Sequence, residues 1–258
     1  MIPLLKECLN RGLIIISSLK VDFICLTLLG IEYRTTMDID FYLKKQELNQ
    51  KNIMAMINEI IKIDNNDLVT FKLKDTKQIR PDDGYGGINV RLICSLQNVK
   101  TIISIDIATG DPVTPSEIDY SYKCLITGKI INIKSYNLET VIAEKLQTVL
   151  ARSLTNSRMK DFYDLYIIWK CKSKELDISI LKEAFANTCK YRDENYTKLE
   201  VTDILFDIKD SRNITLRWNT YSNKFPFAKD IRFFEILSVI DNLILLIYRL
   251  LKKHKQKP

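Results

Sequence analysis

The feature that most constrains this chain is a pair of aspartates inside a β-prone run, residues 34–41. In a strand the side chains alternate between two faces, so Asp38 and Asp40 point the same way and their apolar neighbours point to the other side. Two adjacent carboxylates repel each other unless a cation lies between them. Mg²⁺ takes oxygen ligands and commonly bridges protein carboxylates to substrate phosphates. The pair therefore indicates a phosphoryl- or nucleotidyl-transfer site or, as a structural alternative, an edge strand whose polar face meets water.

A second acidic strand, residues 102–107, favours the metal site. Its three isoleucines at 103, 105 and 107 share one face, and Asp106 lies on the other with Ser104. If this strand lies beside the first, three carboxylates converge, which is the usual complement for two metal ions roughly 4 Å apart. The alternative is that Asp106 caps the turn predicted at residues 110–112.

A predicted helix over residues 138–152 carries charge on its apolar side. Lys145 falls inside the apolar stripe, and Arg152, seven positions further on, follows on the same side. A lysine on a buried face needs an anion, such as a phosphate in an adjoining cleft, unless its ammonium group extends back to water. Glu139 and Glu144 are expected to project into solvent.

The next predicted helix, residues 158–168, repeats this pattern with the opposite sign. Asp161 and Asp164 lie on the face shared by Leu165 and Ile168. Two inward carboxylates and two inward cations on consecutive helices predict a buried network. The network could be structural and hold the helices in register. It could also be catalytic, with Asp161 acting as a base toward an acceptor hydroxyl.

Together these segments resemble the AbiEii/AbiGII-type nucleotidyltransferases, the toxin component of type IV toxin–antitoxin and phage abortive-infection systems. The resemblance runs from about Gly30 to the C-terminus. It is carried, in order, by residues 30–40, 83–87, 105–111, 136–146, 152, 158–164, 188–192 and 217–221. It implies an α/β (α+β) fold, with a polymerase-β-like nucleotidyltransferase core on a mixed sheet and a helical domain that completes the nucleotide site.

The resemblance also implies roles for single residues. Asp38, Asp40 and Asp106 would be ligands of Mg²⁺ or Mn²⁺. Arg34, Lys145 and Arg152 would contact the nucleotide, and Asp161 would be a catalytic carboxylate beside Lys145. The expected reaction transfers a nucleoside monophosphate from an NTP to an RNA such as tRNA, or to a protein. The expected partner is an antitoxin encoded nearby, which need not contact the toxin.

Three other functions remain open at this point. The first is an inactive family member that retains nucleotide or RNA binding. The second is a two-metal phosphohydrolase, and the third is a structural interaction protein without Mg²⁺-dependent nucleotide binding.

The chain departs from the family pattern upstream of the aspartate pair. The family has a Lys-Gly-Gly or Gly-Ser turn there, whose backbone N–H groups approach nucleotide phosphates. Residues 16–23 contain no glycine. One codon spelling of residues 19–23 reads Lys-Gly-Gly-Phe in another frame, so we hypothesise that roughly residues 12–23 are translated out of frame; a gene sequence without those glycine codons would rule this out. Only residues 1–11 precede that segment, which predicts an N-terminally truncated, weakly active or inactive copy.

Composition excludes several classes of site. Six cysteines without paired metal-ligand spacing predict reduced thiols in a cytoplasmic protein. The single histidine, His254, lies in a basic tail, which excludes His-dependent zinc sites and Ser-His triads. Only seven glycines argue against a P-loop or Rossmann site. The net charge of +7 fits an RNA or nucleotide substrate.

The chain is predicted to divide near Lys134, into a catalytic core (1–134) and a helical domain (135–258). Strands are predicted at residues 37–43, 69–73, 88–96, 99–108 and 128–134, and a helix at 47–63. After the division the pattern is helical, with a polar connector around residues 207–223. Residues 233–251 are dense in apolar side chains but interrupted by two acids, which indicates a core helix and not a membrane span.

Overall fold

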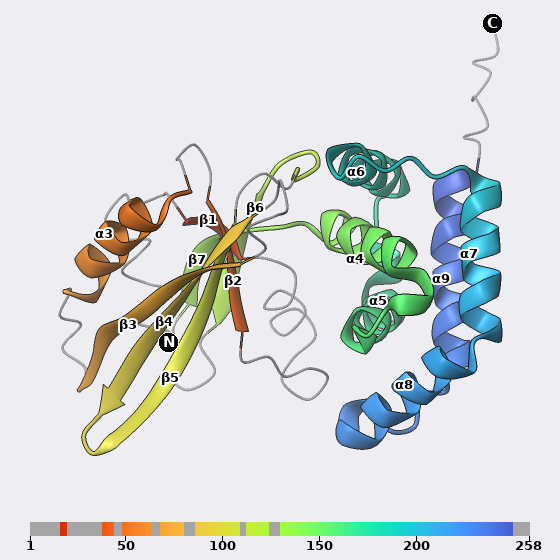
Figure 1. The fold of residues 1–258 in the computed structure, drawn as a ribbon. Helices are drawn as coiled ribbons and strands as arrows, with labels where there is room; N and C mark the ends of the chain where they lie inside the picture. Colours follow the sequence, from red (N-terminus) through yellow and green to blue (C-terminus); the bar gives the residue numbers. More distant parts are fainter. Residues whose placement is uncertain are drawn as a thin grey trace, which may run out of the picture. The chain divides into compact units, whose positions relative to one another are not determined.

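The chain forms two compact units that divide between Asn137 and Leu138. The computed structural model describes residues 16–19, 38–43, 48–62, 68–79, 86–108, 112–123 and 130–249. In these residues the first unit contains a sheet and one α-helix, and the second unit is helical (Figure 1).

The first unit is built on a mixed sheet of seven strands in the order β3-β4-β5-β2-β1-β7-β6. The strands are β1 (Ile16–Leu19), β2 (Asp38–Leu43), β3 (Val69–Ile79), β4 (Gly87–Leu96), β5 (Val99–Ala108), β6 (Ile118–Lys123) and β7 (Ile130–Ser135). Two neighbouring pairs, β2 with β5 and β1 with β7, run parallel, and the other pairs are antiparallel. The mixed sheet agrees with the predicted fold class. Strand β6 was not predicted, because its alternating tyrosines and polar residues lack an apolar run.

One face of this sheet is apolar because β4 and β5 alternate strictly. The side chains of Ile88, Val90 and Leu92 are buried with Ile105 and Ile107 of the neighbouring strand. Helix α3 (Gln50–Ile61) packs on β3 and buries one apolar stripe, consisting of Ile53, Met56, Ile57 and Ile60. Each such side chain contributes roughly 1.5–3 kcal/mol on burial. The apolar face therefore holds the core, and the opposite face is left for polar residues.

The second unit is assembled around helix α4 (Leu138–Arg152), which contacts α5, α6 and α7. The other helices are α5 (Met159–Lys172), α6 (Ile178–Tyr191), α7 (Lys198–Asp210), α8 (Arg212–Lys224) and α9 (Phe233–Tyr248). Short 3₁₀ turns lie at η1 (Ser153–Thr155), η2 (Ser173–Glu175) and η3 (Pro226–Ala228). Helices α7 and α9 lie side by side (Figure 1).

The predicted polar connector around residues 207–223 is wrong, because most of this segment is α8. Helix α8 begins after Ser211, whose hydroxyl accepts a hydrogen bond from the backbone N–H of Ile214 at 3.3 Å. It buries only a narrow stripe, formed by Ile214, Trp218 and Ser222, one turn apart. The remaining residues of the helix are polar or exposed, so its apolar residues are too few for the helical period to be recognised in the sequence.

The apolar segment after residue 232 forms α9, a helix of the core. Its buried side chains recur at helical spacing and comprise Phe233, Ile236, Leu237, Val239, Ile240, Leu243 and Ile244. Across the described ranges, no helix combines the length and the apolar character needed to cross a membrane.

Candidate active site

The two predicted acidic strands are neighbours in the sheet. Strands β2 and β5 run parallel, and their backbone register sets Asp40 directly beside Asp106 and Asp38 beside Ser104. The condition for three converging carboxylates, that the strands be adjacent, is therefore met by the backbone. Asp106 lies inside β5, two residues before its end, and does not cap a turn.

Asp106 is held by an asparagine from the next strand, which sequence reasoning did not single out. Asn89 is the antiparallel register partner of Asp106. Its side-chain amide donates hydrogen bonds to Asp106 Oδ1 at 2.5 Å and to Ser104 Oγ at 2.7 Å. Within the described residues the bond from Asn89 is the hydrogen bond of the Asp106 carboxylate, so Oδ2 is left to accept another ligand. A polar residue between the apolar Ile88 and Val90 is the sequence pattern that could have indicated Asn89 as a site residue.

Polar residues continue across the same face in two rows that follow the register. One row is Lys77, Asn89, Asp106 and Asp40, and the other is Asp75, Arg91, Ser104 and Asp38. Arg91 donates from Nε and Nη2 to the two oxygens of Asp75 at 2.7 and 2.6 Å. This hydrogen-bonded guanidinium holds the pKa of Asp75 below its ordinary value. Asp75 is thus already paired, which leaves the β2–β5 aspartates as the candidate metal ligands on this face.

The second unit contains a buried charge network with three of the four predicted residues, Lys145, Asp161 and Asp164, and with Arg158 as its second cation in place of Arg152. Lys145 Nζ lies 3.1 Å from Asp161 Oδ1 and 2.5 Å from Asp164 Oδ2, and the three side chains are 3%, 1% and 0% exposed. Arg158 Nε adds a bond of 2.6 Å to Asp161 Oδ2. The formal charges of these four side chains cancel, so the anions that Lys145 needs are supplied by helix α5.

This geometry bears on the two roles expected for the network. Both oxygens of Asp161 accept hydrogen bonds from cations, Oδ1 from Lys145 and Oδ2 from Arg158. An ionised carboxylate can accept about four hydrogen bonds, so these contacts do not by themselves decide whether Asp161 acts as a base. The ammonium group of Lys145 has three donors, and its contacts with Asp161 and Asp164 use two of them. The structure describes a network that ties α4 to α5, and both catalytic roles stay predictions.

The sequence was compared with protein families and solved structures. The family model for the nucleotidyl transferase AbiEii toxin of type IV toxin–antitoxin systems matches residues 24–239. The chain belongs to this family. Two solved structures from Helicobacter pylori, a candidate nucleotidyltransferase and JHP933, are each 18% identical to it with a TM-score of 0.49. Each covers 96% of this chain, and the match spans 91% and 88% of theirs. A search of curated proteins gives no match.

Two expectations for α4 of this AbiEii-family chain are wrong. Glu139 and Glu144, expected in solvent, are 7% and 8% exposed, because helices pack on several sides of α4. Glu139 accepts a hydrogen bond of 2.8 Å from the backbone N–H of Asp177, at the start of α6. Glu144 lies 3.9 Å from the guanidinium of Arg192.

Arg152, expected on the buried side, is exposed. It is the last residue of α4, where the packing of the neighbouring helices no longer covers the stripe. Arg34 lies outside the described residues, and so does the segment expected to carry the glycine turn except for the backbone of β1. The described cysteines, Cys94, Cys171 and Cys189, form no disulfide.

Proposed function

We propose that this chain is a Mg²⁺-dependent nucleotidyltransferase toxin that transfers a nucleoside monophosphate from an NTP to an RNA or protein acceptor. The observation that carries the proposal is the parallel register of β2 and β5, which brings Asp38 and Asp40 into line with Ser104 and Asp106. Membership of the AbiEii family supports the reaction class and predicts a functional antitoxin and a role in phage defence.

The residues present fit a hard divalent cation. Carboxylate oxygens are the ligands that Mg²⁺ prefers, and Asn89 leaves one oxygen of Asp106 available. Bound metal ions would stabilise the charge that develops on the transferring and leaving oxygens. The chain's own contribution is the backbone register of Asp38, Asp40 and Asp106 on neighbouring strands, and the half-buried Asn89 donates a hydrogen bond to the carboxylate of Asp106. The side chains of Asp38 and Asp40 lie outside the described residues.

A second candidate is an inactive family member that keeps nucleotide or RNA binding. It is favoured by the absence of glycine in residues 16–23 and by the start of the family match at residue 24, directly after that segment. In family members the glycine turn would supply backbone donors for nucleotide phosphates, and residues 16–23 have no glycine to form it.

Transfer of each α-labelled NTP to total RNA and total protein separates these candidates. The assay uses Mg²⁺, the natural chain, an Asp38→Ala variant and a chain rebuilt with Val21→Gly and Asp22→Gly. Label from the natural chain that is lost in Asp38→Ala would support the transferase and name nucleotide and acceptor together. Label from the rebuilt chain alone would identify a decayed enzyme. Silence from every form would contradict the proposed activity.

The Asn89→Ala variant should weaken metal binding and transfer by about 10- to 100-fold, since residues that orient metal ligands commonly have effects of this size. Metal affinity is measured by titrating the chain with Mn²⁺ and following the EPR signal of the unbound ion. The Mg²⁺ dependence of transfer is measured alongside. The matched control is Asn132→Ala, which removes an exposed asparagine that bonds Ser121 at 2.8 Å across β6 and β7. Equal metal affinities of the two variants would show that Asn89 does not position Asp106.

A further inference from the structure

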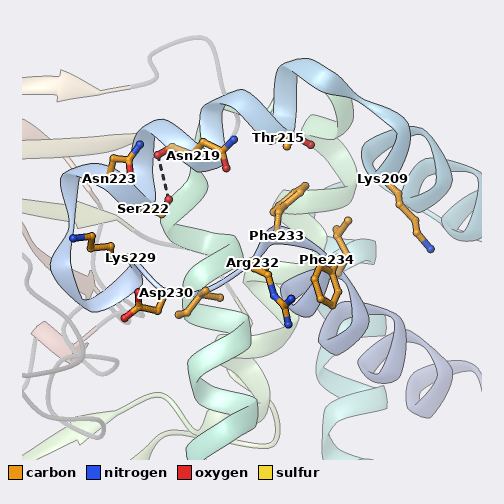
Figure 2. A pocket seen from close by; sticks show the side chains of 12 residues that line it. Lys209, Thr215, Asn219, Ser222, Asn223, Lys229, Asp230, Arg232, Phe233 and Phe234 are labelled. Carbon is orange, nitrogen blue, oxygen red and sulfur yellow. Dashed lines mark hydrogen bonds between the residues drawn. The ribbon is translucent and has the colours of Figure 1, made fainter.

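A pocket of about 570 Å³ lies in the helical unit, among the end of α7, helix α8 and the first turn of α9 (Figure 2). Three cationic side chains line it, Lys209, Lys229 and Arg232, together with one carboxylate, Asp230. Lys209 comes from the end of α7, and Lys229 and Arg232 come from the connection between η3 and α9, so the fold brings positive charge from two segments together. The pocket therefore favours an anionic ligand.

Helix α8 supplies a polar wall. Asn219 and Asn223 stand one turn apart on the same face, and both are exposed. Within the described part of the chain, their side-chain amides make no hydrogen bond. Each amide offers both donors and an acceptor, the combination that reads base edges and ribose hydroxyls. This wall suits a ligand with polar edges as well as charge.

The third element is an exposed aromatic ring at the start of α9. Phe234 is 53% exposed, whereas the adjacent Phe233 is buried. The guanidinium of Arg232 lies 4.5 Å from the centroid of the Phe234 ring, and Glu235 holds it there by a bond of 2.8 Å. An exposed ring beside an arginine is a stacking surface for a nucleobase.

Positive charge also extends beyond the pocket. Between residues 212 and 232 the sequence has five cations and one acid, a net +4 of the chain's +7. The cations outside the pocket are Arg212, Arg217 and Lys224, all exposed. A compact ligand such as a free nucleotide would not use them, whereas a chain of phosphates would.

We infer that this pocket binds single-stranded RNA, with phosphates on the cations, one base stacked on Phe234, and the Asn219 and Asn223 amides on base edges or 2′-hydroxyls. The inference rests on the proposed function and deepens it, because it makes RNA and not protein the acceptor class.

The test is equilibrium binding of a fluorescein-labelled, mixed-sequence single-stranded RNA of about 12 nucleotides to the full chain, without NTP or metal. A triple variant, Lys209→Ala, Lys229→Ala and Arg232→Ala, is compared with a control triple of exposed lysines, Lys174→Ala, Lys190→Ala and Lys198→Ala. The pocket triple should bind at least ~30-fold more weakly and lower the slope of log K against log salt by about 2, since each phosphate contact contributes roughly 0.7. The control triple should lose less than ~3-fold, as expected for charges outside the site.

A second pair of variants tests the stacking contact. Phe234→Ala should weaken RNA binding by about 10-fold, whereas Phe206→Ala, which removes another exposed ring outside the pocket, should leave it unchanged. These variants keep every charge, so they separate base stacking from general attraction.

Equal losses in both triples, or displacement of the RNA by free NTP from the pocket, would overturn the inference. Label transfer to protein by a chain that binds no RNA would also overturn it and leave the proposed function standing. RNA binding that follows the predicted pattern in a chain without transfer activity would support the pocket and remove the proposed function.

Discussion

The Asp106→Asn variant is expected to lose nucleotidyl transfer by about 10³-fold while keeping the unfolding transition of the natural chain. The substitution preserves side-chain volume and removes one negative charge from the β2–β5 face. Charge stabilisation by metal ions supplies several kcal/mol to such reactions, and each 1.36 kcal/mol is about tenfold in rate. The measurement is the initial rate of label transfer at saturating NTP, with thermal unfolding of the same preparations.

The matched control is Asp119→Asn, which makes the same change in the same sheet. Asp119 lies on β6 and pairs with Lys134 of β7 at 2.6 Å, and both side chains are exposed. Because exposed ion pairs contribute about 0–1 kcal/mol, this variant should keep both activity and stability. An Asp106→Asn chain that transfers label at the natural rate would contradict the metal-ligand assignment.

The Lys145→Met variant should lose about 3–5 kcal/mol of unfolding free energy. Methionine fills similar space without charge, so Asp161 and Asp164 would remain buried after losing the ammonium group that contacts both of them. Removing one partner of a buried ion pair is costly because the remaining charge is neither solvated nor paired. The measurement is urea unfolding of the full chain followed by far-UV circular dichroism.

Two further variants test the electrostatic origin of this loss. Lys174→Met, at an exposed site, should change stability by less than about 0.5 kcal/mol. Adding Asp164→Leu to Lys145→Met removes the uncompensated carboxylate, so part of the lost stability should return. The effects of the two substitutions should therefore not add, as is usual for residues in contact. A single Lys145→Met variant as stable as the natural chain would show that the network does not hold α4 and α5 together.

Much of the fold could be predicted from periodicity. The alternation in β4 and β5 and the helical stripe of α4 are local patterns that burial imposes directly on the sequence. The Lys145–Asp161–Asp164 network was also predictable, because charged residues on apolar helix faces require partners of opposite sign. Helix α8 was missed since its stripe is only one residue wide per turn. Glu139 and Glu144 were misplaced because a sequence does not show that α4 is covered on several sides.

Contacts between distant segments could not be predicted in this way. The parallel pairing of β2 with β5 joins strands separated by β3 and β4 in the sequence, and no local pattern specifies which strands pair. The bond from Asn89 to Asp106 depends on the antiparallel register of β4 and β5. The pocket with Lys209, Lys229 and Arg232 exists only once three helical segments have come together.

The most direct test of the central claim is a crystal structure of the full chain with Mn²⁺ and a non-hydrolysable NTP, with the manganese located by its anomalous scattering. The predicted result is a manganese peak coordinated by carboxylate oxygens of Asp38, Asp40 and Asp106, with Asn89 still bonded to Asp106. A manganese site elsewhere in the chain, or nucleotide bound without any metal on these aspartates, would contradict it.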